Sequence, residues 1–248
     1  MKHIGDGDHA VVCLHGWFGH ADGWGYLPEV VDTERFTYWF PEMRGYGDRR
    51  GERGDFTMWE FASDALAAAD EAGIDRFSLL GHSMGGKAAA ALLAQAPDRV
   101  RAFVGLSAVW VGPTPLDDDG EALFFGAAED SQKRYGIIDF TTGNRHSAHW
   151  VQSMVDGSLA TSDVDAFAGA VESWVRADYT DRLSAFEVPA LFVCGAHDPA
   201  LSADLARQTW LAAAGNGRVV ELAGSGHYAT HEEPVAFVTT IEQFLAEH

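Results

Sequence analysis

The sequence predicts an α/β fold with a mostly parallel central sheet covered by helices on both faces. Short apolar runs rich in Val, Leu and Phe alternate along the chain with longer Ala-rich segments. A parallel strand is buried on both faces, so it reads as a continuous apolar run of this kind. The chain of 248 residues is 47% hydrophobic, which provides enough apolar material for a large core.

The individual elements follow from these runs and from the residues that bound them. Thr57 is the expected N-cap of the first long helix, and Glu60, three residues on, would complete a capping box. Gly73 and Pro97 end the first two helices, because neither residue is favourable inside a helix. The expected helices span residues 58–72, 87–95 and 235–246, and the expected strands span 10–14, 36–40, 77–80, 100–106, 190–194 and 218–222.

The alternation stops between the strands at 100–106 and 190–194. About eighty residues there contain no clear strand, and a structureless loop of that length is implausible in a compact domain. We therefore expect an α/β core formed by residues 1–107 and 181–248, with a helical cap, or lid, at 108–180 inserted after the sixth strand. Helical patterns support this insertion near 121–135, 148–154 and 164–177.

Charge and composition exclude several classes of function. The chain carries 37 acidic and 17 basic side chains, a formal net charge of −20. Nucleic acids and anionic membranes are recognised by clustered Lys and Arg, so neither is an expected partner. The expected partner is a small molecule, and the expected assembly is a monomer or a homodimer.

The cysteines and the N-terminal segment favour a cytoplasmic location. Cys13 and Cys194 each lie in an apolar strand run, and two cysteines cannot form a disulfide framework. Buried, reduced thiols are typical of cytosolic proteins. The first ten residues lack the apolar segment of a secretory signal, and the longest mostly apolar stretch, 102–112, is too short to span a membrane.

The most informative motif is Gly81-His82-Ser83-Met84-Gly85, a G-x-S-x-G pattern. It follows an apolar strand and precedes an Ala-rich helix, which is the context in which such a serine acts as a nucleophile. A tight strand-to-helix turn leaves no room for side chains two residues before and two residues after the serine, and glycine occupies both positions. The turn also places Ser83 at a helix N-terminus, where backbone N–H groups stabilise negative charge.

A serine nucleophile needs a base, and the base needs an orienting acid. Asp198 follows the strand at 190–194, and His227 lies in a Gly-rich loop after the strand at 218–222. The order Ser83, Asp198, His227 is the order expected for this strand–turn–helix context. Other histidines compete for the role of base, namely His82, His146, His149, His197 and His231.

Two backbone N–H groups are expected to form the oxyanion hole. One belongs to Met84, the residue after the nucleophile, and the other to Trp17 in the turn after the first apolar strand. His15 in the same turn is expected to be structural. No metal-ligand spacing of Cys and His is present in the sequence, so no metal or other cofactor is expected.

Four motifs in order make the chain resemble α/β-hydrolase-fold proteins of the lid-bearing serine esterase type. They are HGWFG at 15–19, GHSMGG at 81–86, GAHD at 195–198 and GSGH at 224–227. GHSMGG and the helix after it are similar to small intracellular esterases and thioesterases, and HGW with Trp24 resembles the arylesterase and perhydrolase branch. A fifth motif, PEMRGYGD at 41–48, has Glu42 where the family usually has Asp, in a loop that is structural in most members.

The resemblance implies a serine hydrolase that cleaves a carboxylic ester, lactone or thioester through an acyl-enzyme on Ser83. Dehalogenases and epoxide hydrolases of this fold have Asp in place of this serine, and the H-G-x-G-P-G loop of many C–C bond hydrolases is absent. A C–C hydrolase, a lyase or a perhydrolase with the same triad remains an alternative. A ligand receptor on a hydrolase scaffold is the non-enzymatic alternative.

Aromatic side chains of the cap and of the core loops are expected to line a pocket for a small, largely apolar substrate. The alternative for each of them is packing between the cap and the core. The expected substrate-binding residues are Phe18, His82, Trp110, Phe125, Trp150 and Tyr228, with Phe124, Met154 and Trp174 as further candidates.

Overall fold

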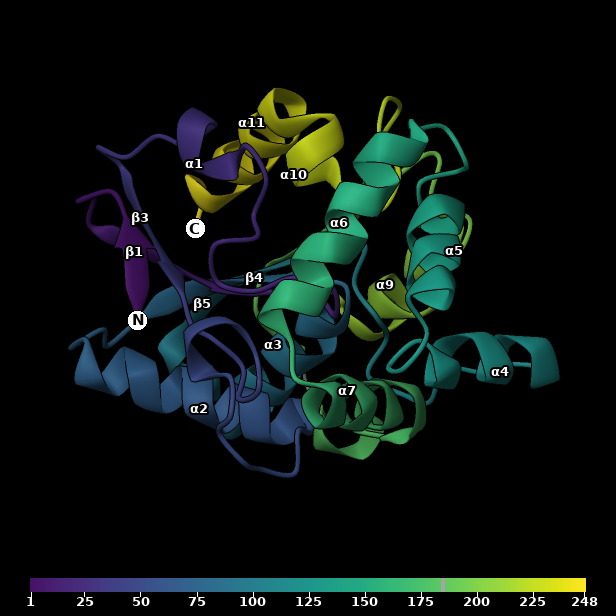
Figure 1. The fold of residues 1–248 in the computed structure, drawn as a ribbon. Helices are drawn as coiled ribbons and strands as arrows, with labels where there is room; N and C mark the ends of the chain where they lie inside the picture. The colour runs from purple at the N-terminus through teal and green to yellow at the C-terminus, as the bar shows by residue number, and fades with distance from the viewer. Residues whose placement is uncertain (184–185) are drawn as a thin grey trace.

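A computed structural model describes residues 1–183 and 186–248 (Figure 1). Residues 184 and 185, which fall in the predicted core segment 181–248, lie outside the described residues. Within the described ranges seven strands form one sheet in the order β1-β3-β2-β4-β5-β6-β7, and all neighbours are parallel except β1 and β3. The strands are β1 (Lys2–Ile4), β2 (His9–Leu14), β3 (Phe36–Phe40), β4 (Phe77–His82), β5 (Val100–Leu106), β6 (Ala190–Gly195) and β7 (Gly217–Leu222).

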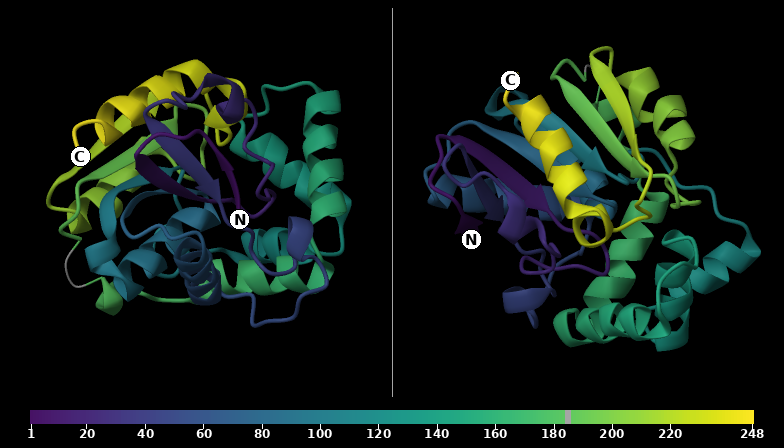
Figure 2. Two further views of the ribbon diagram at one scale, coloured as in Figure 1. Left: turned by 90° about the vertical axis from the view of Figure 1, so that its left-hand side faces the viewer. Right: turned by 90° about the horizontal axis from the view of Figure 1, so that it is seen from above.

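Helices cover both faces of this sheet, which confirms the predicted fold class (Figures 1 and 2). One face packs against α2 (Met58–Glu71), α3 (Met84–Gln95), α8 (Ala203–Gln208) and α9 (Trp210–Ala213). The other face packs against α1 (Leu27–Val30), α10 (Ala229–Glu232) and α11 (Pro234–Leu245). Short 3₁₀ turns lie at Gly47–Arg49, Pro97–Arg99 and Thr180–Arg182.

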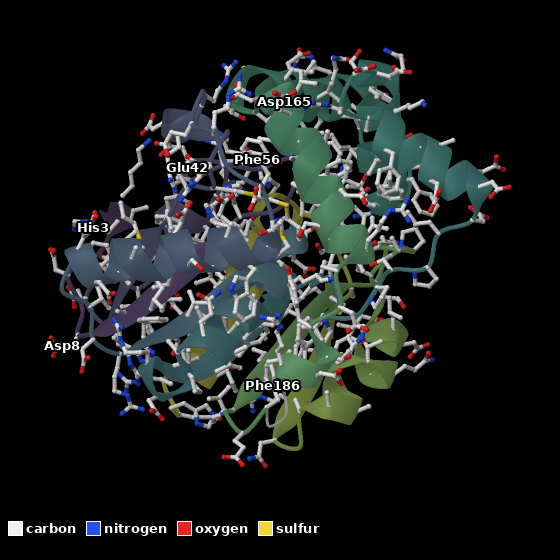
Figure 3. All side chains as sticks on the ribbon, turned by 90° about the horizontal axis from the view of Figure 1, so that it is seen from below. His3, Asp8, Glu42, Phe56, Asp165 and Phe186 are labelled. Carbon is white, nitrogen blue, oxygen red and sulfur yellow. The ribbon has the colours of Figure 1, made fainter. Side chains whose placement is uncertain are left out.

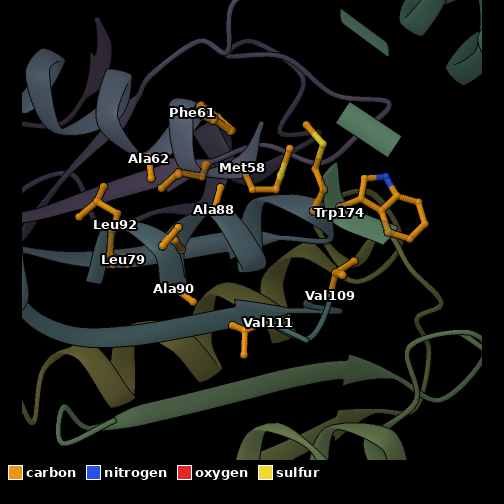
Figure 4. Packing of buried hydrophobic residues seen from close by; sticks show 14 of the residues in the cluster. Met58, Phe61, Ala62, Leu79, Ala88, Ala90, Leu92, Val109, Val111 and Trp174 are labelled. Carbon is orange, nitrogen blue, oxygen red and sulfur yellow. The ribbon is translucent and has the colours of Figure 1, made fainter. Parts of the chain in front are cut away.

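Helices α2 and α3 lie side by side on the first face. Met58 and Phe61 of α2 pack near Ala88 of α3 in the larger buried cluster (Figure 4). Small alanine side chains let the two helices and the sheet approach closely, while the larger side chains of α2 fill the space between them. The helix that begins after Ser83 is therefore held rigidly by its neighbours.

The predicted N-cap of α2 is confirmed, with one difference in its partner. The Glu60 N–H donates to Thr57 Oγ1 at 3.0 Å. The Glu60 carboxylate accepts from the N–H of Phe56 at 2.8 Å and not from that of Thr57, so the reciprocal half of the capping box is displaced by one residue. Phe56, which is labelled in Figure 3, has a φ of 54° and lies against Gly169.

The insertion between β5 and β6 contains the helices α4 (Asp118–Gly126), α5 (Ser131–Thr141), α6 (Ala148–Thr161) and α7 (Val164–Arg176). The single helix expected at 121–135 is thus two helices, because the chain turns after Gly126 and Asp130 caps a new helix by accepting from the Gln132 N–H. The insertion follows the fifth strand and not the sixth, since a single short strand, β1, precedes β2.

A buried lysine joins both ends of the insertion to α3. Lys87 Nζ donates to the carbonyl oxygens of Gly112 at 2.9 Å, Trp174 at 3.0 Å and Ala177 at 2.5 Å. Gly112 precedes α4, and the other two carbonyls lie at the end of α7. Burial lowers the pKa of Lys87 to about 8. Lys87 lies on α3, four residues after Ser83. Its ammonium group therefore fixes the insertion relative to the helix that follows the serine.

No helix in the described ranges has both the length and the apolar character needed to cross a lipid bilayer.

Candidate active site

Ser83 forms the strained turn that the sequence predicts between β4 and α3. Its φ of 56° and ψ of −122° lie in a region that side-chain-bearing residues rarely occupy. Backbone hydrogen bonds hold it there: its N–H donates to Leu106 at 3.0 Å, and its carbonyl accepts from Gly86 and Val109 at 2.9 Å each. The strain is therefore balanced by contacts with β5 and the segment after it.

Glycine is required on both sides of this turn. A Cβ at Gly81 would overlap the backbone of Gly85 and Gly86, and a Cβ at Gly85 would overlap the carbonyl oxygens of Leu14 and His15. Backbone atoms cannot move aside as the end of a flexible side chain can. The two glycines let α3 pass close to both β4 and β2.

Asp198 and His227 form a buried pair. His227 Nδ1 lies 2.6 Å from Asp198 Oδ2, and Asp198 Oδ1 accepts from the N–H groups of Ala200 and Leu201 at 3.0 and 3.1 Å. A carboxylate held by two N–H groups favours the tautomer in which Nδ1 carries the proton, which leaves Nε2 free to act as a base. The structure therefore brings together the acid and the base that the sequence predicts.

Ser83 and His227 line the same cavity, next to the loop after β2. Phe18, His82 and Tyr228, three of the predicted substrate-binding residues, also line it. Helix α6 also contributes to the lining, through Ser153, Met154, Gly157 and Ser158. Of these four, only Met154 was among the candidates from the sequence.

The predictions for Trp110, Phe125 and Trp150 are not supported, because these side chains lie elsewhere in the structure. Trp110 packs edge-on against Trp210, with the ring centres 5.0 Å apart, and does not line the cavity that holds Ser83. The Arg176 guanidinium lies 4.8 Å from the centre of the Phe125 ring, and Trp150 packs edge-on against Tyr228 with the ring centres 6.0 Å apart. Each ring buries its surface against another part of the core or the insertion, which was the alternative to substrate contact.

The other two aromatic candidates pack around Trp17. The ring centres of Phe124 and Trp174 lie 6.2 and 5.7 Å from that of Trp17. Trp17 Nε1 donates to the carbonyl of Phe167 at 2.9 Å. The insertion therefore fixes the side chain of the residue predicted to supply an oxyanion donor.

The predicted oxyanion donors lie beside Ser83. Met84 is the first residue of α3, so its N–H has no partner within the helix, and Trp17 lines the cavity. Neither N–H donates a hydrogen bond to another group in the described part of the chain. A Cβ at Gly16 would lie 3.2 Å from Ser83 Cβ, so the Gly16–Trp17 turn lies directly against the serine.

Glu42 fixes the turn that carries Trp17. Its carboxylate accepts from the N–H of Ala21 at 3.1 Å, and one oxygen lies 3.1 Å from His15 Nε2. His15 is thus structural, as expected. Glutamate in place of the aspartate usual in the family still reaches this turn.

Glu232 is an organising residue that the sequence reasoning missed. Its side chain is 1% exposed, and it accepts from Arg145 Nη2 at 2.6 Å and His146 Nε2 at 2.9 Å. It also accepts from the N–H groups of Gly226 and Tyr228 at 2.8 and 2.9 Å. These two residues flank His227, so Glu232 fixes the histidine loop and connects it to the insertion.

The competing histidines have other surroundings. His82 Nε2 lies 3.0 Å from the His227 carbonyl oxygen, and burial lowers the pKa of His82 well below its usual value, so the ring is neutral at pH 7. His231 also lines the cavity, and burial lowers its pKa. His197 is exposed. Among residues 1–183 and 186–248, neither His82 nor His231 is paired with a carboxylate in the way that His227 is.

Comparisons with known proteins agree with this geometry. A family model described as the alpha/beta hydrolase fold matches residues 9–234. Esterase YbfF of Escherichia coli strain K12 is 28% identical over 249 residues, which cover 95% of this chain and 92% of that protein. A 2-hydroxy-6-oxononadienedioate/2-hydroxy-6-oxononatrienedioate hydrolase of Klebsiella pneumoniae is 26% identical, covering 99% of this chain and 90% of that protein.

Among solved structures, the esterase EaEST from Exiguobacterium antarcticum has a TM-score of 0.88 at 22% identity, covering 99% of this chain and 94% of that one. This likeness shows a common fold. Because the family model spans most of the sequence, and the strand order and the turn at Ser83 fit it, the chain belongs to the alpha/beta hydrolase fold family.

Proposed function

We propose that the protein is a serine hydrolase that cleaves a carboxylic ester, lactone or thioester of a small, largely apolar substrate. The observation that carries this proposal is that His227, whose Nδ1 lies 2.6 Å from Asp198 Oδ2, lines the same cavity as Ser83 on its strained turn. A nucleophile, a base and an orienting acid in one site are the groups that acyl transfer requires.

The proposed reaction proceeds in two halves. Ser83 Oγ attacks the carbonyl carbon while His227 Nε2 takes the hydroxyl proton, and the N–H groups of Trp17 and Met84 stabilise the oxyanion. The alcohol leaves with the proton from His227, and an acyl-enzyme remains on Ser83. Water, activated by His227, then attacks the acyl carbon and releases the acid. Asp198 stabilises the charged imidazole in both halves.

We also propose that residues 108–180 act as a cap that shapes the substrate cavity. The support is that four residues of α6 line the same cavity as Phe18 and Tyr228. An apolar acyl or alcohol group would pack between these aromatic rings and Met154.

Labelling with a fluorophosphonate probe and turnover of p-nitrophenyl acetate test the proposal. Both should be lost in Ser83→Ala. Ser63→Ala is a matched control, because Ser63 is exposed on α2 and should leave both signals unchanged. Normal turnover by Ser83→Ala would refute the nucleophile assignment. A ligand that raises the melting temperature without turnover would favour the receptor alternative.

Carbon–carbon bond hydrolysis is the second candidate, and it is favoured by the similarity to the Klebsiella hydrolase named above. A panel of simple esters, lactones, acyl thioesters and diketones separates the two. Turnover of a diketone in the absence of ester turnover would support the second candidate over the first.

A further inference from the structure

Arg134 of α5 is a buried cation inside the insertion. The residue is 1% exposed, and its guanidinium lies 3.6 Å from the centre of the Phe167 ring. Nε donates to the Ala127 carbonyl at 2.9 Å, and Nη2 donates to the Ala128 carbonyl at 3.3 Å. An arginine side chain keeps its proton at all ordinary pH values, so this site holds a full positive charge.

No carboxylate in residues 1–183 or 186–248 lies within 4.0 Å of this guanidinium. Buried charges in proteins are normally paired, because removing an ion from water is costly. Carbonyl dipoles, hydroxyl groups and a ring face stabilise Arg134 but do not neutralise it. The charged guanidinium therefore acts directly on the hydroxyl groups of α6 to which it donates.

Ser158 of α6 contacts this cation and is also one of the residues that line the cavity. Arg134 Nη1 donates to Ser158 Oγ at 2.7 Å, and more weakly to Ser162 Oγ at 3.3 Å. Ser158 lines the cavity that holds Ser83, whereas Ser162 does not. Since Ser158 Oγ accepts from the guanidinium, its own proton is directed elsewhere, and it has no acceptor in the described part of the chain.

We propose that Ser158, held by Arg134, is a specificity-determining hydrogen-bond donor that selects esters with a second oxygen acceptor away from the scissile bond. This inference rests on the proposed function. The acceptor is a ketone, ester or similar carbonyl oxygen on the acyl or alcohol chain that reaches α6. The rest of that chain packs on Met154, Phe18 and Tyr228, so it is otherwise apolar.

The physical reason is the cost of an unpaired donor. A purely hydrocarbon chain would cover the Ser158 hydroxyl and leave its proton without a partner, whereas a carbonyl oxygen satisfies it. Donation from Arg134 polarises the hydroxyl and strengthens the bond it makes. One such hydrogen bond changes the ratio of kcat/KM between an ester with the carbonyl and its hydrocarbon counterpart by about tenfold.

Matched ester pairs test this inference. Ethyl 4-oxopentanoate is compared with ethyl pentanoate, and 3-oxobutyl acetate with butyl acetate, so that the ketone lies in the acyl chain or in the alcohol chain. Longer homologues of each pair vary its distance from the scissile bond. For the wild-type protein we expect kcat/KM to favour at least one oxo ester by about tenfold.

Three variants locate the effect. Ser158→Ala should bring the kcat/KM ratio of the preferred pair close to one, and Ser158→Thr, which keeps a hydroxyl, should restore most of it. Ser162→Ala is the matched control and should keep the wild-type ratio, because Ser162 bonds to the same guanidinium without lining the cavity. Arg134→Met should lower the ratio, and if that variant does not fold, the serine variants still decide the question.

The outcomes separate the two proposals. Ester turnover without any preference for an oxo ester overturns the inference and leaves the proposed function standing. A preference that survives in Ser158→Ala also overturns it. If the wild-type protein hydrolyses no ester and its Ser83 is not labelled by a fluorophosphonate, the proposed function fails, and this inference fails with it.

Discussion

Replacing Glu232 by alanine should damage both stability and catalysis, although Glu232 takes no part in the proposed reaction. The substitution leaves the N–H groups of Gly226 and Tyr228 without their acceptor. An unpaired buried N–H costs about 1–3 kcal/mol, so the two together reduce the free energy of unfolding by about 2–6 kcal/mol. Arg145 adds little to this loss, because its side chain is 29% exposed and can turn toward water.

The effect on catalysis follows from the position of His227 between these two residues. A shift of about 1 Å in a catalytic group can cost about 100-fold in rate, so we expect kcat to fall by about 10- to 100-fold. Glu232→Gln should lie between wild type and Glu232→Ala. Its amide retains one acceptor oxygen but presents an N–H group to one of the donors that the carboxylate held.

Urea denaturation and ester turnover measure the two effects, with Glu233→Ala as the matched control. Glu233 is the adjacent carboxylate, and among the described residues its side chain accepts a single hydrogen bond, from the exposed Gly224 N–H at 2.9 Å. Glu233→Ala should reduce the free energy of unfolding by less than about 1 kcal/mol. If Glu232→Ala matches Glu233→Ala in both stability and kcat, then Glu232 does not organise the histidine loop.

Three further predictions concern stability. Gly85→Ala should reduce the free energy of unfolding by at least about 3 kcal/mol, because the new Cβ overlaps backbone oxygens. Gly136→Ala, in an open part of α5, should instead increase it by about 0.5–1 kcal/mol, and urea denaturation compares the two variants. Burial lowers the pKa of Lys87 to about 8, so between pH 8 and about 10.4 the unfolded chain holds a proton that the folded chain has released. The free energy of unfolding should therefore rise over this range relative to Lys87→Met, and equal slopes for the two proteins would contradict this. Burial also lowers the pKa of His9 to about 4, so between pH 6.5 and about 4 the unfolded chain holds a proton on His9 that the folded chain lacks. As the pH falls through this range, the free energy of unfolding should therefore decrease less in His9→Gln than in the wild-type protein, as measured by denaturation at each pH.

Local patterns predicted the core and the centre of the site. The strands of the core are continuous apolar runs, and the nucleophile turn is specified within the five residues 81–85. Asp198 and His227 could be predicted because each follows a strand that the sequence marks clearly. Their pairing then follows from the parallel sheet, which brings the carboxyl ends of β6 and β7 together.

Features that depend on distant contacts could not be predicted in this way. Glu232 belongs to a four-residue helix too short to show a periodic pattern, and its partners come from two separate segments of the chain. The short helices α1, α8 and α9 were missed for the same reason. The positions of Trp110, Phe125 and Trp150 depend on how the insertion packs, which spacing along the sequence does not reveal.

The three hydrogen bonds of Lys87 restrict how the insertion can move relative to the sheet. Swinging the whole insertion away from the sheet would separate a buried ammonium group from all its acceptors, at both ends of the insertion at once. Together with the bonds of Arg145 and His146 to Glu232, this attachment holds the insertion to the core at its two ends and between them.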